Sequence, residues 1–120
     1  MHVVLIVEDE VLLAMEMENH VRALGYSVLG PAPSVQAADR LLDGQEPHAA
    51  LLDVNLRGHT VGPIARRLQM SNIPYALVTG YARLSLDDPA LAEAPRLSKP
   101  VSMTELERML RRLLNDTEPS

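Results

Sequence analysis

The chain has 120 residues, 47% of them hydrophobic, and a formal net charge of -5 at pH 7, which suits one domain built around a single core. The acidic balance excludes a general nucleic-acid-binding surface, because phosphate backbones are bound by clustered Lys and Arg. Cysteine is absent, which excludes disulfides and thiol chemistry and is compatible with a reducing cytosol.

The first part of the chain alternates strand and helix patterns. Residues 2–7 form a near-continuous apolar, β-branched run, which is typical of a strand buried on both faces of a parallel sheet. No basic residue precedes this run, and the run is too short for a signal peptide or a membrane span, so we expect a cytoplasmic protein. Over residues 10–24 the apolar positions recur at helical spacing, and Gly25 ends the helix. A brief second strand over residues 27–30 stops where Pro31 breaks the chain.

The same alternation continues through the middle of the chain. Ser34 is the expected N-cap of a second helix, which ends near Gly44. Residues 49–54 repeat the buried-strand pattern. A third helix begins at Thr60 or Gly62, with its apolar residues on one face.

The last part of the chain holds two strands and two helices. The segment "YALVTG" predicts a fourth buried strand, Tyr75–Thr79. Asp and Pro interrupt residues 81–95, which predict only a short or frayed helix. A brief fifth strand covers residues 97–98. The final helix, residues 102–114, begins with a capping box that Ser102 forms with Glu105.

The final helix also carries the one local basic cluster of the sequence. We interpret Arg108, Arg111 and Arg112 as its solvated face. Residues 115–120, beyond this helix, are expected to be disordered. Five strands alternating with five helices predict a doubly wound α/β fold, with right-handed crossovers and a parallel sheet covered on both faces.

Charged and polar residues follow or end four of the predicted strands. They are Glu8 and Asp9 after the first strand, Asp53 and Thr79 at the ends of the third and fourth, and Lys99 after the fifth. In open parallel sheets, ligands bind outside the carboxyl ends of the strands. These groups are therefore expected to meet at one edge, where the carboxylates repel one another unless a cation neutralises them.

The donor types indicate which ion this edge would hold. Oxygen donors, with no Cys and no His pair at metal-ligand spacing, favour Mg²⁺ over Zn²⁺. Mg²⁺ accepts one or two carboxylates and leaves positions for substrate oxygens, so a phosphoryl group can bind there. Lys99 would contact one phosphoryl oxygen and the Thr79 hydroxyl another, with Asp53 as the nucleophile.

Each of these residues also has a simpler interpretation. Glu8 and Asp9 could cap the first helix and favour its dipole. Asp53 could cap a helix or occupy a turn, Thr79 could serve as a β-former, and Lys99 could be a surface lysine. The meeting of matching groups from four separate strands favours the functional interpretation.

Four segments together resemble the receiver domain of bacterial two-component response regulators. They are "VLIVEDE", "LLDVNLRG", "VTGY" and "SKP", which follow the family's order and span nearly the whole chain. The resemblance implies one receiver domain over residues 1–120. It also implies a flavodoxin-like five-stranded sheet of order 2-1-3-4-5.

The resemblance further assigns roles to residues at the strand ends. It implies that Asp53 accepts a phosphoryl group from the phosphohistidine of a partner kinase. Glu8 and Asp9 would bind Mg²⁺ together with Asp53 and the backbone carbonyl of Asn55. Such a receiver assists its own phosphorylation and dephosphorylation and is not a small-molecule enzyme.

The resemblance also implies how phosphorylation is detected. Thr79 and Lys99 would contact the phosphoryl group and report its presence, and the Lys99-Pro100 bond would be cis. Most receivers carry Tyr or Phe three residues before the lysine as a switch residue, whereas this chain has Arg96. The segment "IPYALVTGYAR" resembles instead the FAT GUY receivers of alphaproteobacteria, in which case Tyr81 is the candidate switch residue.

These observations predict a stand-alone receiver that acts as a phosphorylation switch or a phosphoryl relay. Its expected partners are a sensor histidine kinase or phosphotransfer protein and a downstream protein target, without direct contact to nucleic acid or membrane. It would be a monomer or a phosphorylation-dependent dimer. Two alternatives stay open: a small Mg²⁺-dependent phosphatase with an aspartyl-phosphate intermediate, and a degenerate receiver that only binds partners. Such phosphatases often need a second acid two residues after the nucleophile, where this chain has Asn55.

Overall fold

Strands and helices alternate along the computed structural model, which describes residues 2–56, 59–80 and 88–115. A five-stranded sheet, a two-stranded hairpin and five helices lie within these ranges. In chain order the elements are β1 (Val3–Val7), α1 (Val11–Ala23), β2 (Ser27–Ala32), α2 (Val35–Gly44), β3 (Ala49–Asp53), β4 (Asn55–Leu56), β5 (His59–Thr60), α3 (Gly62–Met70), β6 (Tyr75–Thr79), α4 (Pro89–Ala92), β7 (Arg96–Ser98) and α5 (Met103–Leu113).

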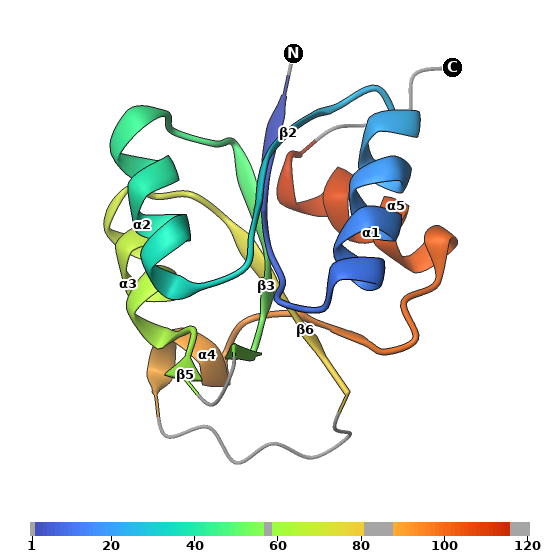
Figure 1. Ribbon diagram of the computed structural model, residues 1–120. Helices are drawn as coiled ribbons and strands as arrows, with labels where there is room; N and C mark the ends of the chain where they lie inside the picture. The colour runs from blue at the N-terminus through green and yellow to red at the C-terminus, as the bar shows by residue number, and fades with distance from the viewer. Residues whose placement is uncertain (1, 57–58, 81–87, 116–120) are drawn as a thin grey trace.

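The five-stranded sheet is parallel throughout and has the order β2-β1-β3-β6-β7. Because the hairpin strands β4 and β5 lie outside this sheet, its order is the predicted 2-1-3-4-5. Helices α1 and α5 cover one face, and α2, α3 and α4 cover the other (Figure 1). The doubly wound α/β fold is therefore confirmed. Its geometry brings the carboxyl ends of β1, β3, β6 and β7 to one edge.

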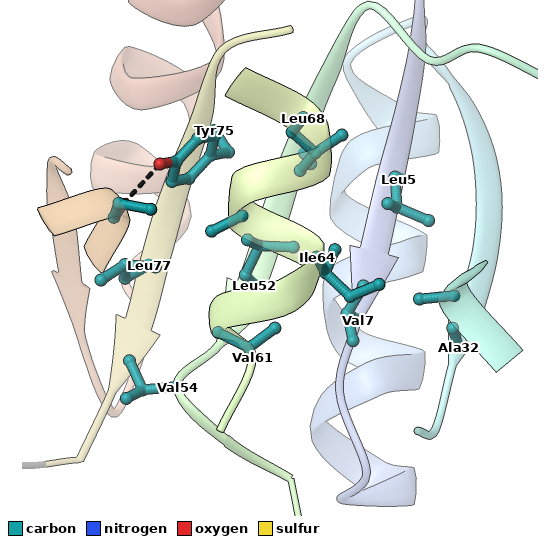
Figure 2. Close-up of a cluster of buried hydrophobic side chains, with 14 of the residues drawn as sticks. Leu5, Val7, Ala32, Leu52, Val54, Val61, Ile64, Leu68, Tyr75 and Leu77 are labelled. Carbon is teal, nitrogen blue, oxygen red and sulfur yellow. Dashed lines mark hydrogen bonds between the residues drawn. The ribbon is translucent and has the colours of Figure 1, made fainter. Parts of the chain in front are cut away.

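The interior strand β1 contributes side chains to two hydrophobic clusters, one on each face of the sheet. Leu5 and Val7 belong to the cluster under α2, α3 and α4, which Figure 2 shows around Ile64 of α3. Val4 and Ile6 belong to the cluster under α1 and α5. Alternate residues of a strand point to opposite faces, so an unbroken apolar run is what a strand covered on both sides requires. The resulting packed frame fixes the strand ends where the polar groups lie.

The serine caps predicted from the sequence are present at two helices. At the start of α2, Ser34 Oγ accepts a hydrogen bond of 3.1 Å from the Ala37 N–H. At the start of α5, Ser102 Oγ accepts one of 3.3 Å from the Glu105 N–H. Each bond satisfies a backbone donor that the first helical turn leaves unpaired. In the described part of the chain, the helices are all too short or too polar to cross a membrane.

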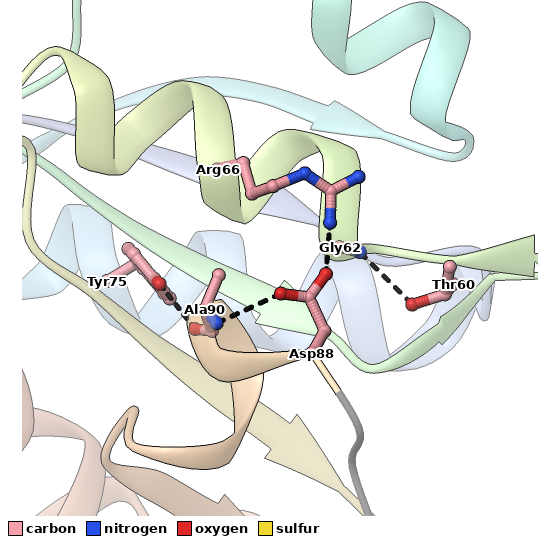
Figure 3. A network of polar contacts seen from close by, with 6 residues as sticks. All are labelled: Thr60, Gly62, Arg66, Tyr75, Asp88 and Ala90. Atoms are coloured by element: carbon pink, nitrogen blue, oxygen red, sulfur yellow. Dashed lines mark hydrogen bonds and ion pairs between the residues drawn. The ribbon is translucent and has the colours of Figure 1, made fainter.

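The short fourth helix predicted from the sequence is α4, a single turn of four residues. Residues 81–87, which precede it, lie outside the described residues. Asp88 caps α4 by accepting a 3.0 Å hydrogen bond from the Ala90 N–H, and its other carboxylate oxygen pairs with Arg66 of α3. Tyr75 of β6 donates its hydroxyl hydrogen to the Ala90 carbonyl (Figure 3). Side chains from α3 and β6 therefore hold α4 in place.

Two local features differ from the prediction. Strand β2 does not stop at residue 30 but continues through Pro31 to Ala32. Pro31 is tolerated because β2 is an edge strand that pairs only with β1, where the register shifts between Leu5 and Val7. The hairpin of β4 and β5 was not predicted, because two-residue strands depend on their pairing and carry almost no periodic signal.

Candidate functional site

The predicted polar residues lie at the carboxyl edge of the sheet. Glu8 follows β1 directly, Asp53 is the last residue of β3 and Thr79 is the last residue of β6. Thr79 pairs with Ser98 of β7, and its carbonyl accepts a 2.8 Å hydrogen bond from the Lys99 N–H. The strand register therefore sets the backbone position from which the Lys99 side chain starts.

Three carboxylates gather at this edge. Glu8, Asp9 and Asp53 each offer one oxygen, and these oxygens all lie within 4.8 Å of one another. Glu8 is 2% exposed and Asp53 is 6% exposed, while Asp9 is partly exposed. The predicted acidic cluster is thus a preformed group of hard oxygen donors with an opening to solvent at Asp9.

Lys99 is the counter-charge of the cluster and the only lysine of the chain. Its Nζ lies 3.5 Å from Glu8 Oε1 and 3.7 Å from Asp53 Oδ1. Partial burial by itself would lower the pKa of Lys99, but the carboxylates of Asp53 and Glu8 outweigh it and raise that pKa. The ammonium is therefore charged at neutral pH.

Glu8 is the most constrained member of the cluster. Its Oε2 accepts a 3.0 Å hydrogen bond from the Glu10 N–H, so the helix-entry role considered for Glu8 is also present. Its Oε1 is buried and has no hydrogen-bond partner among the described residues. Burial first, and then the nearby charge of Asp53, raise the pKa of Glu8 to about 7, although the Glu10 N–H and Lys99 oppose the shift.

A divalent cation fits this arrangement. The Lys99 ammonium lies 3.5 Å from the buried Glu8 Oε1 but is also shared with Glu10 and Asp53, so it compensates the burial of this oxygen only in part. Together with the nearby oxygens of Asp9 and Asp53, Glu8 Oε1 provides the oxygen-only donor set that Mg²⁺ prefers. The residues present therefore suit the ion that the sequence predicts.

One acid near the site was not predicted. Glu10 Oε2 lies 3.9 Å from Lys99 Nζ, and the Glu10 side chain is 64% exposed. It sits at the N-cap position of α1, where it makes no side-chain capping bond. The signal in the sequence was the run of three acids in "EDE", of which only the first two were assigned.

Comparison with known proteins identifies the family. No protein-family model matches the chain, and no curated protein matches it. Among solved structures, the signal receiver domain of a modulated diguanylate cyclase from Desulfovibrio desulfuricans G20 is 30% identical, with a TM-score of 0.83. That match covers 96% of this chain and 94% of the other. The chain belongs to the receiver-domain family of response regulators.

Two further receiver domains resemble this one over nearly its whole length. The receiver domain of PhyR from Erythrobacter litoralis is 25% identical, with a TM-score of 0.83, over 99% of this chain and 95% of that one. The receiver domain of sensor histidine kinase PA1611 from Pseudomonas aeruginosa PAO1 is 25% identical, with a TM-score of 0.82, over 96% and 98% of the two chains. That structure has a magnesium ion coordinated in its active-site cleft.

The remaining predicted residues of this receiver are placed as follows. The peptide bond between Lys99 and Pro100 is cis, and Thr79 is 4% exposed. Asn55 is the first residue of β4. Tyr81, the candidate switch residue, lies outside the described residues. Arg96 is exposed and donates from Nη2 to the Ala92 carbonyl at 3.3 Å.

Proposed function

We propose that Asp53 of this receiver accepts a phosphoryl group from the phosphohistidine of a sensor histidine kinase or phosphotransfer protein. The observation that carries the proposal is the geometry around Asp53. Its carboxylate ends a fully buried strand, belongs to a three-carboxylate cluster and lies 3.7 Å from the ammonium of Lys99. A nucleophile, a set of metal ligands and a fixed cation are the parts that phosphoryl transfer requires.

Glu8, Asp9 and Asp53 would hold Mg²⁺, together with the backbone carbonyl of Asn55. Bound there, the ion supplies positive charge that offsets the repulsion between the acidic cluster and the incoming phosphoryl oxygens. The buried Glu8 Oε1 supports this assignment, because it accepts no hydrogen bond from the described residues and shares the single ammonium of Lys99 with Glu10 and Asp53.

The transfer step needs little more than positioning. A bond forms between a carboxylate oxygen of Asp53 and phosphorus, while the bond from phosphorus to the histidine nitrogen of the donor breaks. Strand β3, buried along its whole length, holds Asp53 in a fixed direction for in-line attack. Lys99 then pairs with one oxygen of the new phosphoryl group and the Thr79 hydroxyl donates a hydrogen bond to another.

The contacts of Lys99 and Thr79 with the phosphoryl group would also transmit the signal to a partner protein. Lys99 is shared among Glu8, Glu10 and Asp53. A phosphoryl group on Asp53 would therefore draw Lys99 away from Glu8 and Glu10. Thr79 lies at the end of β6, directly before the segment that leads to α4. Phosphorylation would favour one arrangement of that segment and of Tyr81, and a downstream protein would bind that arrangement. The receiver thereby acts as a switch or a phosphoryl relay through protein contacts, and not as a small-molecule enzyme.

The proposal is tested by phosphotransfer from candidate histidine kinases with Mg²⁺, read by intact mass. Wild type should gain the mass of one phosphoryl group, and Asp53→Asn should gain none. Asp43→Asn is the matched control, because Asp43 lies on α2 and pairs with Arg67 at 2.7 Å, away from the acidic cluster. Equal labelling of wild type and Asp53→Asn removes Asp53 from its role. Continuous turnover of small phosphoesters would favour the phosphatase instead.

A further inference from the structure

Glu10 lies at the mouth of the candidate site, beside Lys99. Its carboxylate oxygen Oε2 is 3.9 Å from Lys99 Nζ, and its side chain is 64% exposed, whereas that of Lys99 is 25% exposed. The side chains of Glu8 and Asp53, which also lie near this ammonium, are buried more deeply. Lys99 is therefore flanked by an inner pair of acids and by one outer acid.

The backbone of Glu10 is held on both sides. Its N–H donates a 3.0 Å hydrogen bond to Glu8 Oε2, and its carbonyl accepts a 2.9 Å hydrogen bond from the Ala14 N–H in the first turn of α1. These two bonds fix the point from which the Glu10 side chain starts. Its charge therefore keeps a defined place beside Lys99, although the side chain itself reaches solvent.

Three ordinary roles do not account for the Glu10 side chain. It occupies the N-cap position of α1 but accepts no capping hydrogen bond. It lies outside the group of close carboxylate oxygens, which contains Glu8, Asp9 and Asp53. Its ion pair with Lys99 is long and partly exposed, and pairs of this kind contribute little to stability. What the side chain brings to the mouth of the site is its negative charge.

A cavity of about 550 Å³ opens beside Glu10 and Lys99. Its lining includes the carboxylates of Glu10 and Glu16, the imidazole of His20 and the ammonium of Lys99. It also includes Gly80, which directly follows the end of β6. A molecule that reaches Lys99 from this side therefore meets two carboxylates first.

The charge of Glu10 acts on any phosphoryl group that Lys99 holds. A phosphoryl oxygen at hydrogen-bond distance from Lys99 Nζ would lie within about 7 Å of the Glu10 carboxylate. This separation is shorter than the screening length of about 8 Å at physiological salt. A donor with more negative charge is therefore repelled more strongly.

Phosphoryl donors differ in the charge of the group that leaves. An acyl phosphate is a dianion at neutral pH and releases a carboxylate, whereas phosphoramidate is a monoanion because its nitrogen is protonated. Asp53 is buried, so in an in-line transfer the leaving group points away from it, toward solvent. There the carboxylate of Glu10 attracts a protonated nitrogen and repels a departing carboxylate.

We propose that Glu10 selects phosphoryl donors by charge, disfavouring acyl phosphates and favouring donors whose leaving nitrogen is protonated. The inference rests on the proposed transfer of a phosphoryl group to Asp53. An Asp53 oxygen forms the bond to phosphorus while the phosphorus–oxygen bond of acetyl phosphate breaks and acetate leaves. With phosphoramidate, the phosphorus–nitrogen bond breaks and ammonia leaves. The receiver thereby favours nitrogen-linked donors, the class to which phosphohistidine belongs.

The test compares acetyl phosphate with phosphoramidate at equal concentration with Mg²⁺, and follows labelling by intact mass. Glu10→Gln should raise the rate with acetyl phosphate relative to that with phosphoramidate by about fivefold. Glu10→Asp keeps the charge and should retain the wild-type ratio. Glu46→Gln is the matched control, because Glu46 is exposed and precedes β3, at the opposite end of that strand from Asp53. It should change the ratio by less than about twofold.

Ionic strength gives a second readout, which a purely structural role of Glu10 would not change. Salt screens the repulsion between Glu10 and a dianionic donor. Raising KCl from about 0.02 M to about 0.5 M should therefore increase the ratio of the two rates by about threefold in wild type. The increase should be smaller in Glu10→Gln, because the screened charge is missing. Circular dichroism of each variant verifies that the fold is retained.

Several results would overturn the proposal. An equal ratio in wild type and Glu10→Gln would remove the selection, and equal acceleration with both donors would mean that Glu10 acts only by holding Lys99. An equal change in Glu46→Gln would assign the effect to net charge. Labelling of every variant by a kinase, but by neither small donor, would show that donor charge does not exclude acyl phosphates. Labelling by acetyl phosphate that appears only in Glu10→Gln would support the selection.

Failure of the selection is distinguishable from failure of the proposed function. Labelling of Asp53→Asn by phosphoramidate would remove Asp53 as the phosphoacceptor. Labelling that requires Asp53 but shows no effect of Glu10→Gln would overturn only the selection of donors by charge.

Discussion

The ammonium of Lys99 lies 3.7 Å from the Asp53 carboxylate, so the only lysine of the chain faces the residue that we assign as the phosphoacceptor. Lys99→Met should slow phosphotransfer by about tenfold to a hundredfold, because a fixed cation at developing phosphoryl charge is lost. Lys99→Arg should retain part of the rate, since the charge remains while the geometry changes. The measurement is the rate of labelling by one kinase at fixed Mg²⁺. A Lys99→Met rate equal to wild type would show that Lys99 takes no part in the transfer.

The raised pKa of Glu8 predicts how pH affects the metal-free protein. Its ordinary value is 4.5, and in the folded protein it is about 7, so the folded state keeps a proton that the unfolded chain releases. The stability of the metal-free protein should therefore fall as pH rises from 4.5 through 7 and then level off. Urea unfolding across this range measures the effect. Glu8→Gln should flatten the profile and be more stable than wild type above neutral pH.

The same proton predicts the pH dependence of metal binding. Mg²⁺ must displace it from Glu8, so the affinity for Mg²⁺ should rise about tenfold from pH 6 to pH 8 and little thereafter. Titration calorimetry in two buffers of different ionisation enthalpy would detect the proton that is released. Glu8→Gln should bind Mg²⁺ more weakly and lose this pH dependence. An affinity that stays constant over this range would show that Glu8 is already ionised.

Asp88 makes two separable contributions to α4. One oxygen caps the helix at the Ala90 N–H, and the other pairs with Arg66. Asp88→Ala should destabilise the protein by about 1–2 kcal/mol through loss of the cap. Arg66→Ala removes only the partly exposed ion pair and should cost less than about 1 kcal/mol. Urea unfolding gives the free energies, and amide exchange in α4 shows whether the loss is local. Equal costs for the two variants would contradict the dominance of the cap.

Gly62, the first residue of α3, lies beside the Asp88 side chain. A Cβ added there would lie 2.5 Å from Asp88 Oδ2 and 3.4 Å from Arg66 Nη1. Gly62→Ala should therefore displace the Asp88 side chain and cost about 1–3 kcal/mol. Gly44→Ala is the control, because nothing lies within 4 Å of its added Cβ and it should be neutral or slightly stabilising. A neutral Gly62→Ala would mean that Asp88 shifts without loss of its contacts.

Features with a local physical cause were predictable from the sequence. The buried strands are visible in the sequence as short apolar runs. Ser34 and Ser102 lie where the first turn of a helix needs a side-chain acceptor. The rule that parallel strands present their carboxyl ends at one edge was enough to bring Glu8, Asp53 and Lys99 together. Each of these inferences needs only the residue type and its place within one element.

Features that depend on how elements far apart in the sequence pack together were not predictable in this way. The extension of β2 through Pro31 depends on its position at the edge of the sheet. The pairing of Arg66 with Asp88 joins residues 22 positions apart, and no periodic pattern marks it. Arg96 and Arg108 line one pocket only because β7 lies beside α5.

The solitary lysine has a practical consequence for handling the protein. Apart from the terminal α-amino group, every amine-directed dye, crosslinker or acylating reagent has one target, and that target is in the acidic cluster. Conventional amine coupling would therefore modify the candidate site itself. The absence of cysteine offers the remedy, since a single engineered thiol on a distant helix would be a unique attachment point.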